Sequence, residues 1–120
     1  MVEMYMIWIT SDRIEPTMKV KNVKIPIAQI KELCQLYHIN KFALFGSVLR
    51  DDFMPNSDID VLVEFQVGYT PGFFKLHQIQ EEISQLFDGR KIDLVTPKFL
   101  NYQIRDQILD EMEVCYVAKG

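Results

Sequence analysis

"ALFGSVLRDDFMPNSDIDVLVEF", residues 43–65, ends in an apolar run that carries two aspartates, Asp58 and Asp60. Three apolar residues in succession, Val61, Leu62 and Val63, predict a central strand over 58–65 that is covered on both faces. An ionised carboxylate in such a strand is costly because it loses its hydration. Two of them side by side therefore need a partner that compensates their charge.

Side chains on a strand alternate between its faces, so Asp58 and Asp60 point the same way, with Cα atoms about 6.5 Å apart. Asp93 repeats the pattern between Ile92 and Leu94, in a second predicted strand over 91–95. Three converging carboxylates repel one another, and divalent cations remove that penalty. Oxygen ligands of this kind favour Mg²⁺ or Mn²⁺. Asp58 alone also fits a turn after "PNS", whereas an aspartate flanked by apolar residues is harder to explain in that way.

Gly46 and Ser47 break a short predicted strand over 41–45 and precede a short predicted helix over 48–51. Glycine allows a phosphate to approach the backbone closely. Ser47 would stand at the helix start, where free N–H groups and the helix dipole favour an anion. A Gly-Ser pair alone is an ordinary turn. Joined to the carboxylates, it predicts a site for a metal-bound nucleoside triphosphate.

The rest of the chain predicts three longer helices and a terminal strand, which with the three strands above give an α/β fold: a small mixed sheet with helices packed against it. The helices are expected over 26–38, over 70–87 with Thr70 and Pro71 at its start, and over 96–112 with Thr96 and Pro97 at its start. The terminal strand is expected over 114–117. The core is expected to include Cys34, Phe73, Phe74 and Phe87.

The N-terminal part is the least regular. Residues 4–9, "MYMIWI", could form an extra strand, and residues 10–24 are typical of a polar linker. We therefore expect an N-terminal extension over 1–24 and one folded domain over 25–120, and Met18 could be an alternative start.

Composition narrows the function. The net charge of −4 disfavours non-specific nucleic-acid binding. Cys34 and Cys115 form neither a CxxC pair nor a disulfide framework, and no apolar run is long enough to span a bilayer. We expect a cytoplasmic protein with no membrane partner.

"FGS", ten residues and then "DID" resembles the Gly-Ser-x10-Asp-x-Asp signature of the DNA polymerase β-like nucleotidyltransferases, with Asp93 in the place of the third carboxylate. The size resembles the minimal nucleotidyltransferase (MNT) proteins, and the likeness covers about residues 26–113. It implies the polymerase β-like fold. It also implies that Asp58 and Asp60 bind two Mg²⁺ ions, and that Asp93 binds the catalytic one and could help to deprotonate the acceptor.

The same resemblance implies that Gly46 and Ser47 hold the phosphates of ATP. Many members have Arg-Gly where this chain has Arg50-Asp51, so Arg50 either orients a phosphate, braces the loop or forms a surface ion pair. MNT proteins are often paired with a HEPN-domain toxin, and the MntA-type antitoxins move AMP from ATP to a tyrosine hydroxyl of that toxin. The resemblance thus implies such a reaction and a hetero-oligomer with the toxin. Two alternatives stay open: an inactive MNT subunit that neutralises a toxin by binding, and an enzyme with a small-molecule acceptor.

Overall fold

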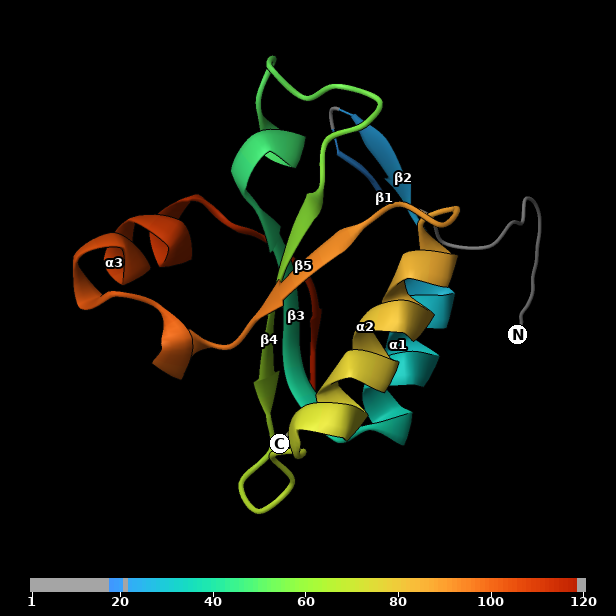
Figure 1. Ribbon diagram of the computed structural model, residues 1–120, viewed down its shortest axis with the longest axis vertical. Helices are drawn as coiled ribbons and strands as arrows, with labels where there is room; N and C mark the ends of the chain where they lie inside the picture. Colours follow the sequence, from blue (N-terminus) through green and yellow to red (C-terminus); the bar gives the residue numbers. More distant parts are fainter. Residues whose placement is uncertain (1–17, 21, 119–120) are drawn as a thin grey trace, which may run out of the picture.

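The centre of the molecule is a mixed sheet of four strands in the order β5-β4-β3-β6. The computed structural model describes residues 18–20 and 22–118. The strands of this sheet are β3 (Ile39–Phe45), β4 (Ile59–Phe65), β5 (Ile92–Val95) and β6 (Glu113–Val117), and the helices are α1 (Ile27–Leu36), α2 (Phe73–Leu86) and α3 (Tyr102–Glu111). β3 pairs antiparallel with β4 and β6, and β5 pairs parallel with β4. α1 and α2 cover one face, and α3 lies on the opposite side (Figure 1). The predicted α/β fold with a small mixed sheet is confirmed.

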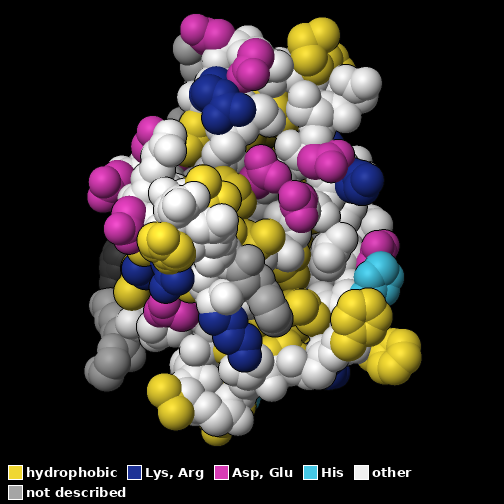
Figure 2. Space-filling model, turned by 60° about the vertical axis from the view of Figure 1, so that its left-hand side comes forward, with side chains coloured by type: hydrophobic (Ala, Val, Ile, Leu, Met, Phe, Trp, Pro, Cys, Tyr) yellow, Lys and Arg dark blue, Asp and Glu magenta, His cyan; other side chains and the backbone are white. Residues whose placement is uncertain are grey.

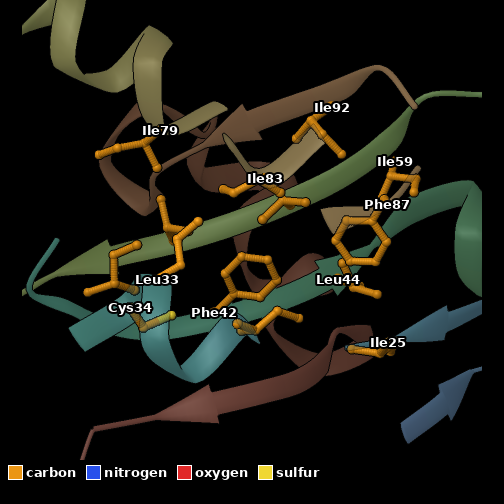
Figure 3. Close-up of a cluster of buried hydrophobic side chains, with 14 of the residues drawn as sticks. Ile25, Leu33, Cys34, Phe42, Leu44, Ile59, Ile79, Ile83, Phe87 and Ile92 are labelled. Atoms are coloured by element: carbon orange, nitrogen blue, oxygen red, sulfur yellow. The ribbon is translucent and has the colours of Figure 1, made fainter. Parts of the chain in front are cut away.

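The hydrophobic core lies between the sheet and the helix pair α1 and α2, where side chains of all these elements meet (Figure 3). Ile59, Val61 and Val63 of β4 are fully buried in this core. Leu62 is also fully buried and points to the other face of the strand. β4 is therefore the central strand that its apolar run predicts, and Cys34 of α1 is buried in the core as expected.

Two aromatic side chains that we expected in the core lie on the surface. Phe73 is 81% exposed and Phe74 is 87% exposed, whereas Phe87 is buried as predicted. The buried residues of α2 are Ile79, at the middle of the helix, and Ile83, one turn later. The first turn of α2 extends past the core, which is why the prediction for Phe73 and Phe74 is wrong.

The predicted starts of two helices are also wrong. α2 begins at Phe73, after an extended Gly72, and no side chain caps it. Thr96 is extended and buried, and the Pro97 that follows opens only the short 3₁₀ turn Pro97–Phe99. α3 begins later, at Tyr102, where the side chain of Asn101 accepts a hydrogen bond of 2.8 Å from the N–H of Gln103. Leu100 is in an extended conformation, so the helix cannot run through from the 3₁₀ turn.

Other boundaries shift by a few residues. β3 begins at Ile39 rather than at residue 41, because the left-handed backbone of His38 (φ 57°) completes the turn after α1. The predicted short helix over 48–51 is a 3₁₀ turn, Gly46–Leu49. The terminal strand is present as β6. No helix in the part of the chain that the structure describes is long and apolar enough to cross a membrane.

The segment expected to be a polar linker is folded in its second part. β1 (Met18–Val20) and β2 (Val23–Ile25) pair antiparallel as a hairpin, and Ile25 is fully buried in the core. A fully buried isoleucine anchors the hairpin to the domain, so the linker prediction is wrong for this part. Residues 4–9 lie outside the described residues, and the division at residue 24 stays a prediction that falls within β2.

Candidate active site

The turn after β3 and the carboxylate of Asp60 are in direct contact. Phe45, the last residue of β3, pairs with Asp60 across the antiparallel ladder, and Gly46 follows in a left-handed conformation with φ +77°. A Cβ atom at Gly46 would lie 2.2 Å from Oδ2 of Asp60. The turn therefore needs glycine for two reasons: its backbone conformation, and the space that the carboxylate occupies.

Asp60 and Asp93 face each other on neighbouring strands, because they are paired in the parallel register of β4 and β5. Asp58 precedes β4 by one residue and stands two residues before Asp60, which places it toward the same face. Figure 2 shows acidic side chains grouped near the middle of the face that it presents, with a basic side chain at the edge of the group. The structure thus brings the three predicted carboxylates to one place, beside the Gly-Ser turn.

The electrostatics of this group centre on Asp60. Its pKa is raised from the ordinary value of 3.8 to about 6, first because the carboxylate is partly buried, and then because of the negative charges of Asp93 and Asp58. A side-chain hydrogen bond with Asp93 acts in the same direction, while the positive charge of Arg50 opposes the rise in pKa. Without a bound cation, Asp60 therefore keeps its proton up to about pH 6.

A divalent cation fits the chemistry of this donor set. All three side chains offer carboxylate oxygens, which Mg²⁺ prefers. The pKa of Asp60 is raised by burial first and by the neighbouring carboxylates next, and a cation would offset both effects. Among the described residues, no three His, Cys, Asp or Glu side chains already have the geometry of a complete metal site. Side-chain rotation would therefore have to accompany metal binding.

Arg50 and Ser47 frame the turn. Ser47 is half-buried in the 3₁₀ turn, and its carbonyl accepts a hydrogen bond of 2.9 Å from the N–H of Arg50. The guanidinium of Arg50 lies 3.3 Å from a carboxylate oxygen of Asp52, and both side chains are exposed. Arg50 therefore forms a surface ion pair with Asp52, which is one of the alternatives that the sequence left open. Its positive charge also lowers the pKa of Asp60.

Two further residues lie at the site: Lys91, for which the sequence favours a solvated charge over a phosphate contact, and Asn22, which the sequence does not point to. Nζ of Lys91 lies 4.0 Å from Oδ2 of Asp58, a long and largely exposed contact that contributes little to stability. The side chain of Asn22 donates hydrogen bonds to the backbone just after Ser47. A lysine just before a strand is only a weak sign of a functional site in the sequence, and an asparagine in a polar stretch gives no sign of one.

A cavity of about 610 Å³ lies farther along β4, between its end, the start of α2 and the chain after β5. Glu64, Phe65, Leu76 and Thr96 contribute to its lining. Glu64 stands four residues after Asp60 on the same strand, so their Cα atoms are about 13 Å apart. The cavity is therefore separate from the carboxylate group.

Comparison with known proteins agrees with this geometry. Residues 27–115 match the family model of the nucleotidyltransferase domain. The chain belongs to this family. It is homologous to the protein adenylyltransferase MntA of Thermococcus cleftensis, with 32% identity over 90 residues that make up 75% of this chain and 86% of the relative.

Solved structures give the same fold for this nucleotidyltransferase domain. One, named as a "putative minimal nucleotidyltransferase", has a TM-score of 0.61 and 28% identity, over 72% of this chain and 86% of its own. Another is a crystal structure of a toxin-antitoxin with AMP-PNP, with a TM-score of 0.63 and 18% identity, over 79% of this chain and 76% of its own. At this identity the second likeness shows the fold alone.

Proposed function

We propose that this chain is a metal-dependent protein adenylyltransferase, which moves AMP from ATP to a tyrosine hydroxyl of a HEPN-type toxin. By this modification it acts as the antitoxin of that toxin. The observation that carries the proposal is the contact of Gly46 with the carboxylate of Asp60, beside Asp58 and Asp93. It joins the turn that we expect to bind phosphate to the carboxylates that we expect to bind the metal. The kinship with MntA, a protein adenylyltransferase, supports the acceptor class.

The residues divide the work as follows. Asp58 and Asp60 would hold two Mg²⁺ ions, with Asp93 as a further ligand of one of them. Bound Mg²⁺ would neutralise the triphosphate and make its α-phosphorus a better electrophile. Gly46 leaves room for the phosphates, and Ser47 offers its hydroxyl and the N–H groups of the turn. Arg50 stands close enough to exert its charge on Asp60 and would add positive charge to the phosphate side.

The reaction is a displacement at the α-phosphorus. The acceptor oxygen forms the new bond to phosphorus while the bond to the bridging oxygen breaks, and pyrophosphate leaves with that electron pair. The proton of the acceptor hydroxyl passes to the carboxylate of Asp93, which is exposed and can meet an incoming protein. The residues act by positioning the groups and by balancing charge.

Co-expression with the product of the neighbouring gene tests this function. We expect a stable complex, and mass spectrometry should find one or more AMP groups on the partner when Mg²⁺ is present. The matched control is the double variant Asp58→Asn, Asp60→Asn, which should bind the partner and leave it unmodified. An unmodified partner that the double variant still inhibits fully would contradict the transferase and favour neutralisation by binding.

A further inference from the structure

We propose that Asn22 is a positioning residue for the Gly-Ser loop and, through it, for the triphosphate. The side-chain amide of Asn22 donates one hydrogen bond of 2.6 Å to the carbonyl of Val48 and another of 2.9 Å to the carbonyl of Arg50. Both partners are acceptors, so the amide must present its NH₂ group, and both of its N–H bonds are used. The inference rests on the proposed function for its nucleotide step.

The two carbonyls stand at the exit of the 3₁₀ turn Gly46–Leu49, where a short helix leaves acceptors without partners of its own. A turn of this length has few internal hydrogen bonds to hold its shape. Gly46 rests against Asp60 at the entrance of the turn, and Asn22 binds the backbone at its exit. The loop is thus attached at both ends, which fixes the direction of the N–H groups between them.

Asn22 reaches this place from a distant part of the chain. Val48 and Arg50 are 26 and 28 residues away in sequence. Asn22 lies in the turn of the hairpin between β1 and β2, which stands at the same end of the sheet as the 3₁₀ turn (Figure 1). The fully buried Ile25 anchors that hairpin to the core. The match to the nucleotidyltransferase family begins only at residue 27, so this support comes from outside the matched domain.

Three variants test the proposal. Asn22→Ala removes both donors, Asn22→Gln keeps an NH₂ group, and Asn40→Ala is the matched control. Asn40 also donates through its side-chain amide, to Oε1 of Glu64 at 3.2 Å, but it does not contact the loop. The first measurement is hydrogen exchange of the Arg50 amide without nucleotide, because this N–H is bonded to the carbonyl of Ser47. The second is calorimetric binding of AMP-PNP with Mg²⁺.

We expect faster exchange of the Arg50 amide in Asn22→Ala and an affinity for AMP-PNP that is about tenfold weaker, since two hydrogen bonds to the loop are lost. Asn22→Gln should recover most of the affinity, and Asn40→Ala should change neither quantity. In transfer assays the KM for ATP should rise about tenfold in Asn22→Ala with kcat nearly unchanged, because the loop holds the phosphates in the ground state and the transition state alike.

Unchanged exchange of the Arg50 amide, or unchanged affinity for AMP-PNP, in Asn22→Ala would overturn the proposal. So would an equal loss of affinity in Asn40→Ala, which would indicate general loosening of the fold. Failure of the wild-type chain to bind AMP-PNP would overturn the proposed function and with it the nucleotide step. The exchange of the Arg50 amide would then decide by itself whether Asn22 holds the loop.

Discussion

Replacement of Asp60 by asparagine should stabilise the metal-free protein at neutral pH. The folded protein holds a proton on Asp60 up to about pH 6, whereas the unfolded chain loses it near the ordinary pKa of 3.8. Between these two pH values the folded state binds more protons, so the free energy of unfolding falls as pH rises. This loss of unfolding free energy is complete above about pH 6 and absent below pH 3.8. An asparagine side chain at this position is neutral at every pH, so the variant would keep that free energy.

The size of the effect follows from the raised pKa. The difference between 3.8 and about 6 corresponds to at most about 3 kcal/mol. Asp60 is only partly buried, and solvent screening reduces this to about 1 to 2 kcal/mol. Asp60→Asn should therefore unfold with a free energy about 1 to 2 kcal/mol above that of the wild type at about pH 7.5, and the two proteins should converge near pH 4.

Urea unfolding in EDTA at several pH values measures this difference, with Asp106→Asn as the control. Asp106 is exposed on α3 and undergoes the same chemical change away from the carboxylate group. Addition of Mg²⁺ should stabilise the wild type more than Asp60→Asn, because the variant has lost a ligand. A variant that is less stable than the wild type near neutral pH, or a difference that does not depend on pH, would refute the reasoning.

Three further outcomes are expected. Gly46→Ala should abolish AMP transfer and destabilise the fold by about 1 to 3 kcal/mol, because its Cβ would meet Asp60. The control Gly68→Ala, at φ +87° with no atom within 4 Å, should suffer the backbone strain alone, so equal losses of stability in the two variants would refute the contact. Ser47→Ala should weaken the binding of AMP-PNP modestly, by about 1 kcal/mol in calorimetry, and unchanged binding would place the phosphates elsewhere. A chain that begins at Met18 keeps the hairpin of β1 and β2 and should fold and transfer AMP, so its loss of solubility would show that residues 1–17 are needed for the fold.

The carboxylate group could be predicted because its signal is local. Asp60 and Asp93 are each flanked by apolar residues, and the alternation of side chains along a strand predicts the face to which each carboxylate points. What the sequence could not show is that these two residues are direct partners in the parallel register, or that Gly46 has no room for a side chain beside Asp60. Both facts arise when distant segments pack together.

The wrong predictions came from local signals that tertiary structure overrides. A threonine followed by proline favours a helix start, yet Thr96 is buried after β5 and the chain makes only a 3₁₀ turn there. Asn22 shows the opposite failure. Its polar neighbours predicted a linker, because no local pattern reports a hydrogen bond to a loop 26 residues away.

The two halves of the candidate site cannot act independently, because they share one contact. Oδ2 of Asp60 fills the space beside Gly46, so a carboxylate that turns toward a cation also changes the wall of the Gly-Ser turn. Asn22 holds the far end of the same turn, which leaves the turn little freedom to absorb that change. A cation at Asp60 would offset the repulsion between the carboxylates and a triphosphate at the turn, so each would improve the binding of the other, and linkage requires the two effects to be equal. In this way the metal and the phosphates would complete each other's binding site.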